Sequence, residues 1–396
     1  MENKALFAAI LRGSIIGKTG LPWIVSCEAA AGIPGDSVFD INIDSETEIE
    51  KKITENIKGF PSRKIPLKIE INYSGKKYSY LTAPDFTGLE KIRKGDIRQW
   101  WDTGNLMVLN CSTTPDFGSS RAFVMKNRIA LVTGGAQGFG EEIVRGLVSA
   151  GAVVFIADLN IIGAVMLADS LNKEYGKKTA IAIEVNVADE ASVEKMTETI
   201  ALTAGGLDLC VSNAGVLRAA SVLEQDIASF RFVTDINYTA FTIVTKHCGL
   251  LMKAQNQCAH TWMTDIIQIN SKSGLDGSNK NGAYAGSKFG SIGLVQSFAK
   301  ELVEFSIKVN AVCPGNFFDG PLWADPEKGL FVQYLRTGKV PGAKTIEDVK
   351  AFYEAKVPMG RGCTGPDVIR AVLYLVEQVY ETGQALPVTV GQVMLS

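Results

Sequence analysis

Residues 128–158 read RIALVTGGAQGFGEEIVRGLVSAGAVVFIAD. Two short runs rich in β-branched residues enclose a glycine-rich turn and an amphipathic segment that begins at Gly138. A strand, a helix and a second strand in this order are typical of a βαβ unit, whose two strands lie parallel. This stretch therefore predicts the start of a parallel sheet.

The same alternation continues along the rest of the chain. Further strands are expected at 180–185, 207–213, 265–270 and 307–312, and helices near 161–174, 190–204, 226–254 and 283–304. Strands that alternate with helices build a parallel sheet with helices on both faces. The sequence predicts one α/β domain over residues 124–396, a doubly wound parallel sheet of the Rossmann type.

Residues 1–120 have a different pattern, which we interpret as a smaller α+β domain. Period-two alternation in LKIEINY (67–73) and KKYSYLT (76–82), around the Ser-Gly pair at 74–75, predicts a β-hairpin. The turn-forming stretch CSTTPDFGSS at 111–120 is expected to be a linker between the two domains.

A helix is also expected at 44–57 (DSETEIEKKITENI). Ser45 is a candidate N-cap, and Glu48 stands three residues later, which is the spacing of a capping box. One apolar face of this helix carries Ile49, Ile53 and Ile57. Since no motif in the first 120 residues indicates a chemical role, we interpret this region as a packing or oligomerisation module.

The composition argues against several classes of function. With 46% hydrophobic residues, 21% charged residues and a formal net charge of −2, the chain offers no general basic field to nucleic acid or to an anionic membrane. Arg12, Lys18 and Pro22 interrupt the N-terminal apolar stretch, which argues against a signal peptide. Seven cysteines without a CxxC spacing and two histidines indicate neither a disulfide framework nor a metal site. We expect a cytoplasmic protein without a bound metal.

The glycine-rich turn TGGAQGFG (133–140) lies between the first strand and the first helix. Glycines at 134, 138 and 140 allow a tight turn and a close backbone approach to a pyrophosphate at the helix N-terminus, which favours anions. Asp158 closes the second strand, where a carboxylate can accept hydrogen bonds from an adenosine ribose and would repel a 2′-phosphate. This favours NAD over NADP, although a helix-capping aspartate is the alternative.

A second motif lies in NSKSGLDGSNKNGAYAGSK at 270–288. Tyr284 and Lys288 are four residues apart on a predicted helix, so their side chains share one face. A nearby cation favours the ionised form of a phenol, and the loop before the helix can bring Ser271 to the same place. The motif predicts a proton-exchanging tyrosine, unless the pair is only an ordinary helix surface.

These features together resemble the short-chain dehydrogenase/reductase family across residues 124–396. The resemblance rests on TGGAQGFG at 133–140, SNAG at 212–215, Asn237 in DINYTA, Ser271, YAGSK at 284–288 and PG at 314–315. It implies that Tyr284 exchanges the proton and that Ser271 holds the substrate oxygen. It also implies that Lys288 lowers the tyrosine pKa and binds the nicotinamide ribose, and that Asn237 supports a water-linked proton relay. Ser273 competes with Ser271, but it lies two residues short of the family spacing.

The resemblance further implies an NAD site and a homodimer or homotetramer. The residues implied in cofactor binding are Gly134, Gly138, Phe139, Gly140, Asp158, Asn186, Asn213, Gly215, Tyr284, Lys288, Pro314 and Gly315. Asn186 stands where the family usually has aspartate, and an amide there can still bind adenine. The threonine often found beyond the PG pair is replaced in the run PGNFFDGPLW.

Within the family, IIQINSKSG, the GN of PGNFF, KVPMGRGC and TVGQVM resemble stretches of polyol-phosphate dehydrogenases. This implies interconversion of a phosphorylated polyol and ketose, sorbitol 6-phosphate and fructose 6-phosphate, with Asn316 at the substrate. A substrate phosphate needs cationic donors, for which Arg218 and Lys272 are the first candidates and Lys280 and Lys356 the alternatives.

Other functions remain open at this stage. The same residues suit a reductase of another polyol or of acyl-carrier thioesters, because the fold does not fix the substrate. A protein of a different class, a regulator that senses nucleotides and binds partners through residues 1–120, is also possible, although a sensor does not need a proton-exchanging tyrosine.

Overall fold

The computed structural model describes residues 1–27, 38–60, 65, 67–93 and 124–394. The expected linker at 111–120 lies outside the described residues.

The larger part of the chain forms the predicted doubly wound parallel sheet. Its seven strands follow the order β11-β10-β9-β8-β5-β6-β7, and every neighbouring pair is parallel. The strands are β5 (Ile129–Thr133), β6 (Val153–Asp158), β7 (Ala180–Glu184), β8 (Leu209–Ser212), β9 (Thr264–Ile269), β10 (Ile307–Pro314) and β11 (Ala385–Val388). The prediction of a Rossmann-type sheet is confirmed, and β11 is a strand that the sequence analysis did not identify.

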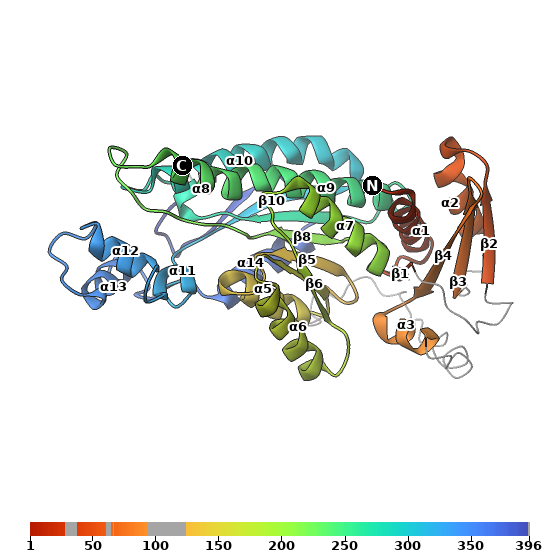
Figure 1. Ribbon diagram of the computed structural model, residues 1–396, viewed down its shortest axis with the longest axis horizontal. Helices are drawn as coiled ribbons and strands as arrows, with labels where there is room; N and C mark the ends of the chain where they lie inside the picture. Colours follow the sequence, from red (N-terminus) through yellow and green to blue (C-terminus); the bar gives the residue numbers. More distant parts are fainter. Residues whose placement is uncertain (28–37, 61–64, 66, 94–123, 395–396) are drawn as a thin grey trace.

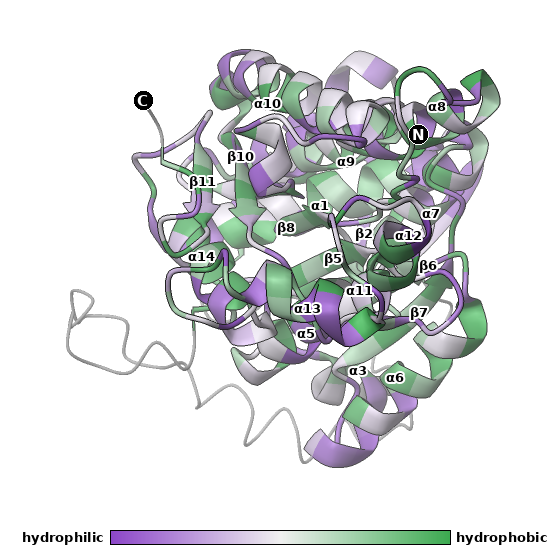
Figure 2. Ribbon diagram, turned by 90° about the vertical axis from the view of Figure 1, so that its left-hand side faces the viewer, coloured by the Kyte–Doolittle hydropathy of each residue, from purple (hydrophilic) through white to green (hydrophobic). Residues whose placement is uncertain are grey.

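Helices cover both faces of this sheet (Figure 1). One face packs against α7 (Glu190–Ala204), α9 (Ala240–Asn256) and α10 (Gly282–Leu302), and the other against α5 (Gly138–Ser149), α6 (Ile161–Tyr175) and α14 (Gly365–Glu377). Within β5, Ile129 and Leu131 enter the first core, whereas Ala130 and Val132 enter the second. Strands buried on both faces read as continuous apolar runs, and Figure 2 shows them as hydrophobic between the helices.

The helical region predicted at 226–254 is divided. It consists of α8 (Ile227–Thr234), a π-helical turn (Asp235–Thr239) and α9. Single π-turns inside helices occur frequently at functional sites, and this one contains Asn237.

Three short helices follow β10 and were not predicted: α11 (Pro321–Ala324), α12 (Leu330–Arg336) and α13 (Ile346–Glu354). They enclose a small aromatic core of their own, in which Trp323 contacts the rings of Phe318, Phe331, Tyr334 and Tyr353. Figure 1 places these helices at one end of the molecule and the N-terminal unit at the opposite end.

The N-terminal unit contains a four-stranded sheet of order β1-β4-β3-β2. Its elements are α1 (Asn3–Thr19), β1 (Ile24–Ser26), β2 (Val38–Ile43), α2 (Ile49–Gly59), β3 (Lys68–Tyr73), β4 (Lys76–Ala83) and α3 (Phe86–Arg93). The predicted hairpin is confirmed, because β3 and β4 pair antiparallel around Ser74 and Gly75. Both turn residues have positive φ, 54° and 74°, as a type I′ turn requires.

The predicted capping box is wrong, although the buried face of its helix is confirmed. Ile49, Ile53 and Ile57 are buried, but α2 begins only at Ile49, after a 3₁₀ turn over Glu46–Glu48. The Ser45 hydroxyl lies 3.2 Å from Thr47 Oγ1 and caps no helix amide. Glu48 instead forms an ion pair with Lys52 at 3.4 Å.

Helix α1 joins the N-terminal unit to the Rossmann-type domain. It packs against α2 on one side and against α7 and α9 on the other. A Cβ atom on Gly13 would lie 2.0 Å from the carbonyl oxygen of Gln255, and one on Gly17 would lie 2.2 Å from that of Cys258. The two glycines therefore permit a helix contact that any side chain would prevent.

The same contact buries an ion pair. Arg12 and Asp208 are both fully buried, and the guanidinium donates to the two carboxylate oxygens at 3.1 and 2.7 Å. Asp208 also accepts from the backbone nitrogen of Ile129 at 2.7 Å and from the Trp262 indole at 2.9 Å. Burial opposes the charge on Asp208, but Arg12 outweighs it, and the pKa of Asp208 is lowered. This carboxylate ties α1 to the first residue of β5.

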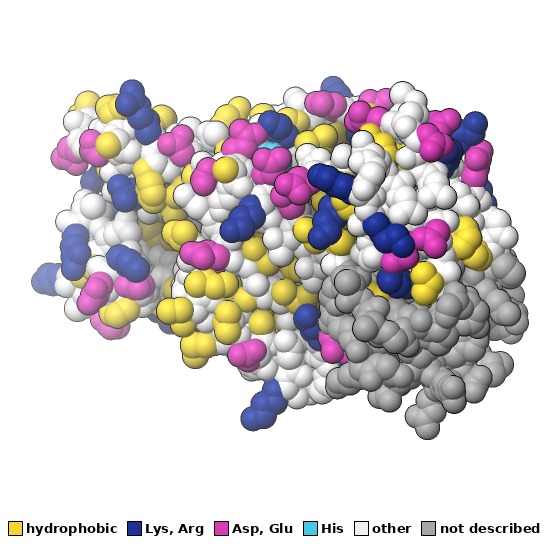
Figure 3. Space-filling view, turned by 45° about the vertical axis from the view of Figure 1, so that its right-hand side comes forward, with side chains coloured by type: hydrophobic (Ala, Val, Ile, Leu, Met, Phe, Trp, Pro, Cys, Tyr) yellow, Lys and Arg dark blue, Asp and Glu magenta, His cyan; other side chains and the backbone are white. Residues whose placement is uncertain are grey.

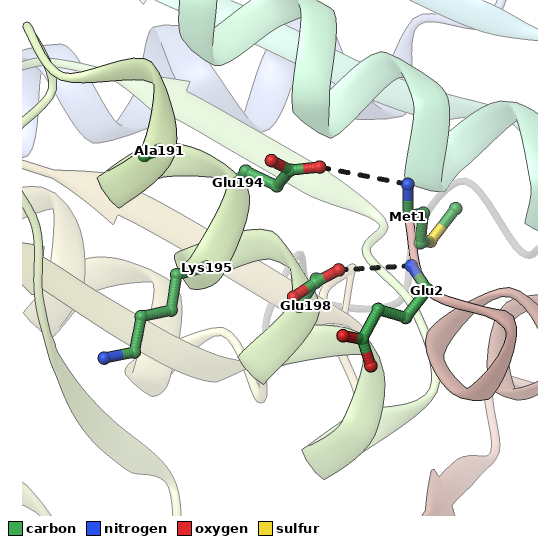
Figure 4. A pocket seen from close by; sticks show the side chains of 6 residues that line it. All are labelled: Met1, Glu2, Ala191, Glu194, Lys195 and Glu198. Carbon is green, nitrogen blue, oxygen red and sulfur yellow. Dashed lines mark hydrogen bonds and ion pairs between the residues drawn. The ribbon is translucent and has the colours of Figure 1, made fainter.

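A shallow hollow lies between α7 and the start of the chain (Figure 4). There the backbone nitrogen of Glu2 donates to Glu198 Oε1 at 3.1 Å, and the Met1 nitrogen lies 3.9 Å from Glu194 Oε1. These contacts seat the first residues on α7.

The face shown in Figure 3 carries basic and acidic side chains intermixed, without a continuous basic surface. Within the described ranges, none of the helices combines the length and the apolar character that crossing a bilayer requires.

The Arg12→Met substitution tests the buried pair. It should lower the free energy of unfolding by about 3–5 kcal/mol, because it leaves a buried carboxylate without its cation. Urea denaturation of the full chain measures this value. Adding Asp208→Asn to Arg12→Met should restore part of the loss.

The matched control is Arg145→Met, which removes an exposed ion pair with Glu141 at 2.8 Å. An exposed pair of this spacing contributes about 0.3–0.5 kcal/mol. If Arg12→Met destabilises the protein no more than Arg145→Met does, the buried pair does not hold the two units together.

Candidate active site

The glycine-rich turn after β5 has room for no added side chains. Gly134 and Gly138 have φ of 61° and 60°, and a Cβ atom on Gly140 would lie 1.9 Å from the carbonyl oxygen of Gly134. The amide of Asn213, at the end of β8, donates to the carbonyl oxygens of Thr133 and Gly134 at 3.0 Å each. Asn213 thus fixes the backbone of the turn. No side chain caps the first turn of α5.

Asp158 ends β6 beside this turn, as the sequence predicted. Its two carboxylate oxygens accept from the backbone nitrogens of Ala136 and Asn160, both at 2.9 Å. Each carboxylate oxygen has a second lone pair, so these bonds leave acceptor capacity for a ribose hydroxyl. The helix cap of α6 is supplied by Asn160, which accepts from Gly163.

Asn186 lies two residues beyond the end of β7 and is exposed. Its side-chain oxygen accepts from the backbone nitrogen of Ala188 at 3.1 Å. Its amide nitrogen is the group that remains for an adenine ring.

The structure brings Tyr284, Ser271 and Lys288 together. Ser271 lies at the start of the loop after β9, and its hydroxyl is close enough to the phenol of Tyr284 on α10 to favour a lower pKa of that phenol. Ser271 Oγ also accepts from the backbone nitrogen of Ser273 at 3.1 Å, so Ser273 supports Ser271 through its backbone.

The expected lowering of the tyrosine pKa by Lys288 is not the net result. The Lys288 ammonium lies 5.8 Å from the centre of the Tyr284 ring. Burial raises the pKa of Tyr284, and the hydrogen bond with Ser271 acts in the opposite direction without cancelling it. The cost of placing a phenolate among apolar neighbours is the largest cause of the raised pKa.

Lys288 is itself almost completely buried, with 4% of its surface exposed. Its ammonium donates to the carbonyl oxygen of Ile269 at 2.9 Å, and burial lowers its pKa to about 8. Beside it lies Cys313 of β10, whose pKa burial raises to about 12. No sequence motif pointed to this thiol, which is inert in its protonated form.

Asn237 faces the turn at 213–216 from the π-helical segment. Its side chain donates to the carbonyl oxygen of Val216 at 2.9 Å and accepts from the nitrogen of the same residue at 2.8 Å. It also donates to Ser287 Oγ at 3.2 Å. A Cβ on Gly215 would lie 3.4 Å from Asn237 Oδ1 and 3.8 Å from the Lys288 ammonium, so this turn passes directly over both side chains.

The loop after β10 contains Pro314, Gly315 and Asn316. Gly315 donates its backbone N–H to Val388 at 2.9 Å, and Cys363 donates its backbone N–H to the carbonyl oxygen of Asn316 at 2.8 Å. The side-chain nitrogen of Asn316 is buried and has no hydrogen-bond partner among the described residues. A buried donor without a partner is costly unless a ligand supplies the acceptor.

The next residue, Phe317, stacks on Phe139 of the glycine-rich turn, with ring centres 4.5 Å apart. Pro321 is also close, since a Cβ on Gly138 would lie 3.5 Å from its ring. The segment after β10 therefore lies against the turn after β5.

The two candidate phosphate ligands have different environments. Arg218 is exposed and committed to α8, where its guanidinium donates to Ser229 Oγ at 3.0 Å and lies 4.2 Å from the centre of the Phe232 ring. Its role as a phosphate ligand stays a prediction, and these local contacts are the ones that it makes in the structure. Lys272, next to Ser271, is half-buried, and its pKa is lowered by burial and by the charge of Lys356.

Sequence reasoning missed the aromatic residues of α11–α13, although Tyr284 packs against their core. The dense aromatic content of residues 317–353 was the signal that could have found them.

A nicotinamide dinucleotide fits these residues. The turn has no space for a Cβ at Gly140, the first turn of α5 has no side-chain cap, and Asn316 keeps an unpaired buried donor. Among the described residues, no group of three or more His, Cys, Asp or Glu side chains is placed to hold a metal ion.

Comparison with known proteins identifies relatives among dehydrogenases and reductases. The short chain dehydrogenase family matches residues 128–324. Sorbitol-6-phosphate 2-dehydrogenase of Escherichia coli (strain K12) is 32% identical over 271 residues, which cover 68% of this chain and 99% of that protein. The 3-oxoacyl-acyl-carrier-protein reductase FabG of Aquifex aeolicus (strain VF5) is 30% identical over 269 residues, 67% of this chain and 98% of that protein.

Among solved structures, sorbitol-6-phosphate 2-dehydrogenase SrlD from Erwinia amylovora is 36% identical, with a TM-score of 0.62. The match covers 67% of this chain and 100% of that chain.

The Gly140→Ala substitution tests the glycine-rich turn. Its methyl group would collide with the carbonyl oxygen of Gly134, and the resulting distortion should weaken NADH binding by about tenfold or more. Fluorescence titration measures the affinity, and circular dichroism establishes that the variant is folded.

Gly293→Ala is the matched control, because a Cβ at this position of α10 meets nothing within 4 Å. It should leave NADH affinity unchanged and stabilise the helix by about 0.5–1 kcal/mol. Unchanged NADH affinity in Gly140→Ala would contradict the assignment of the turn.

Proposed function

The chain belongs to the short chain dehydrogenase family, and from this premise we propose that it is an NAD-dependent dehydrogenase interconverting sorbitol 6-phosphate and fructose 6-phosphate. The observation that carries the proposal is the contact of Ser271 with the phenol of Tyr284, beside the buried ammonium of Lys288. The two sorbitol-6-phosphate dehydrogenases support the substrate, since each is matched over nearly its whole length.

In the proposed reaction, Tyr284 exchanges a proton with the substrate oxygen. Alcohol oxidation transfers the hydroxyl proton to the phenolate of Tyr284, and ketone reduction returns it to the new alkoxide. Ser271 donates a hydrogen bond to the same substrate oxygen and orients it. A positioned acid-base group of this kind contributes roughly 10² to 10⁴ in rate.

A bound nicotinamide supplies the chemistry that the side chains lack, since it accepts the hydride of the alcohol or donates one to the ketone. Lys288 holds the nicotinamide ribose and places its charge next to the phenolate. Asn237 holds the turn at 213–216 in place through its bonds to Val216. Asn316 offers its unpaired amide nitrogen to the substrate. The remaining cofactor contacts expected from the glycine-rich turn, Asn213, Pro314 and Gly315 stay predictions.

Asp158 supports NAD as the cofactor. Its carboxylate stands at the end of β6, bonded to the backbone of the glycine-rich turn, and has free lone pairs for ribose hydroxyls. A 2′-phosphate at the same position would meet a negative charge.

Reduction of an acyl-carrier thioester is the second candidate, favoured by the likeness to the Aquifex reductase. We place it second because the sorbitol-6-phosphate enzymes match the chain at higher identity. The homodimer or homotetramer, and a cytoplasmic location, also stay predictions.

A substrate and cofactor panel tests the proposal on the full chain. Sorbitol 6-phosphate, sorbitol, galactitol and 3-hydroxyacyl thioesters are compared by the rate of reduced cofactor formation, each with NAD and with NADP. We expect the highest kcat/KM with sorbitol 6-phosphate and NAD.

The Asp158→Ser substitution tests the choice of cofactor. It should lower the affinity for NAD and reduce the preference for NAD over NADP, because the carboxylate that repels the 2′-phosphate is lost. A parent enzyme that prefers NADP would contradict the role of Asp158.

Tyr284→Phe tests the proton exchange. The variant should lose turnover by roughly 10² to 10⁴ while its NADH affinity stays within about twofold, because only the hydroxyl is removed. Lys288→Ala should reduce both turnover and affinity. Parent-level turnover in Tyr284→Phe would exclude the proposed mechanism.

A further inference from the structure

Four lysines from three separate segments form a group near Tyr284, which we call the lysine cluster: Lys272, Lys280, Lys339 and Lys356. Lys272 follows Ser271 after β9, Lys280 precedes α10, and the other two follow α12 and α13. Three of the four are half-buried, and Lys356 is exposed. The other three lie close enough to Lys339 for their charges to lower its pKa.

The lysine cluster adjoins the reacting groups. Asn281, which directly follows Lys280 and precedes Tyr284 by less than one helical turn, lies 3.0 Å from the hydroxyl of Tyr334. Tyr334 belongs to the aromatic core against which Tyr284 packs. Lys272 is the residue next to Ser271, whose hydroxyl influences the pKa of the Tyr284 phenol.

Aromatic rings hold two of these side chains. The Lys339 ammonium lies 4.0 Å from the centre of the Tyr334 ring, and the Lys356 ammonium lies 3.9 Å from that of Phe352. Cation–π contacts contribute about 0.5–1 kcal/mol at exposed sites and more where water is excluded. The helices α12 and α13 therefore position these charges above the core.

The backbone of Lys280 is unusual. Its φ is 55°, a left-handed conformation that residues other than glycine adopt rarely. Its carbonyl oxygen accepts from Ala220, and its ammonium donates to the carbonyl oxygen of Thr337 at 2.9 Å. This conformation brings the loop before α10 into contact with the end of α12.

No carboxylate neutralises the lysine cluster. Among the described residues, none of its members forms an ion pair with Asp or Glu within 4.0 Å, although Asp276 lies near Lys272. Burial lowers the pKa of Lys339 to about 8, and the charges of Lys272, Lys356 and Lys280 contribute to the shift. Like charges gathered without a counter-charge are destabilising, and a bound anion removes that cost.

We propose that the lysine cluster binds the phosphate group of the substrate while the carbon that is oxidised or reduced lies at Tyr284. This inference rests on the proposed function, because it assumes a phosphorylated substrate at that site. A phosphate monoester carries about −1.5 to −2 charges at pH 7 and three acceptor oxygens, which suits several ammonium donors. The cofactor's adenosine end is expected at Asp158, at the end of β6, whereas Lys272 and Lys280 of the cluster belong to the loop that carries Ser271 and leads to Tyr284.

Kinetics of Lys339→Met and Lys356→Met in the full chain test the proposal. Each should lower kcat/KM for sorbitol 6-phosphate by about 10- to 100-fold, the loss of one hydrogen bond to a charged group. With unphosphorylated sorbitol, kcat/KM should change by less than about twofold. Lys177→Met is the control, because Lys177 is exposed in the loop between α6 and β7 and should leave both substrates unaffected. Equal losses with both substrates, or no loss with sorbitol 6-phosphate, would overturn the proposal.

A binding measurement separates this inference from the proposed function. Inorganic phosphate is titrated calorimetrically into the parent, Lys339→Met, Lys356→Met and Lys177→Met. The anion site is supported if the parent and Lys177→Met release heat on binding phosphate and the two cluster variants do not. This result holds even if sorbitol 6-phosphate proves not to be a substrate. Turnover of sorbitol 6-phosphate with unchanged kinetics in the cluster variants would leave the proposed function intact and reject the lysine cluster.

Discussion

The buried ion pair of Arg12 and Asp208 is the constraint on which the arrangement of the two units depends. Neither charge has access to water, so each requires the other, and Arg12 can reach Asp208 only if α1 lies against α9. Gly13 and Gly17 make that approach possible. Because Asp208 also accepts from the backbone nitrogen of Ile129, the pair fixes α1 at the end of the sheet where β5 and β8 begin. The opposite end, where the strands finish, is left for ligands, as in other open parallel sheets.

In this arrangement the N-terminal unit lies at one end of the molecule and the candidate active site lies at the other. The glycine-rich turn, Asp158, Ser271 and Asn316 all follow the carboxyl ends of strands, and α11–α13 lie at that end of the molecule (Figure 1). The described residues of the N-terminal unit contribute none of the contacts that hold these groups. Their apolar residues, among them Ala5, Ala9, Ile24 and Leu81, instead join one continuous core with β5, α7 and α9. The N-terminal unit therefore acts on the Rossmann-type domain through packing.

The sequence predicted those features that depend on local pattern. Alternating strand and helix periods located the parallel sheet, and the turn at Ser74 and Gly75 gave the hairpin, because both signals lie within a few residues. Sequence reasoning failed where the partners of a residue come from distant segments of the chain. Arg12 interrupts an apolar stretch, and its partner is 196 residues away. The lysines near Tyr284 come from three segments, and no local pattern predicted that Lys339 lies among them. The capping box failed because Glu48 pairs with Lys52 and the helix starts later.

The proposed proton exchange at Tyr284 depends on the electrostatics of its phenol and of the neighbouring Lys288 ammonium. Burial disfavours both charged forms, since it raises the pKa of the phenol and lowers that of the ammonium to about 8. The Lys288 ammonium lies 5.8 Å from the centre of the Tyr284 ring, where a positive charge favours the phenolate over the phenol. The carbonyl oxygen of Ile269 holds that ammonium in place, and the Ser271 hydroxyl acts to lower the pKa of the phenol. Under the proposed roles, the tyrosine therefore releases its proton only with both neighbours in position, which couples the chemistry to the fold of the loop after β9.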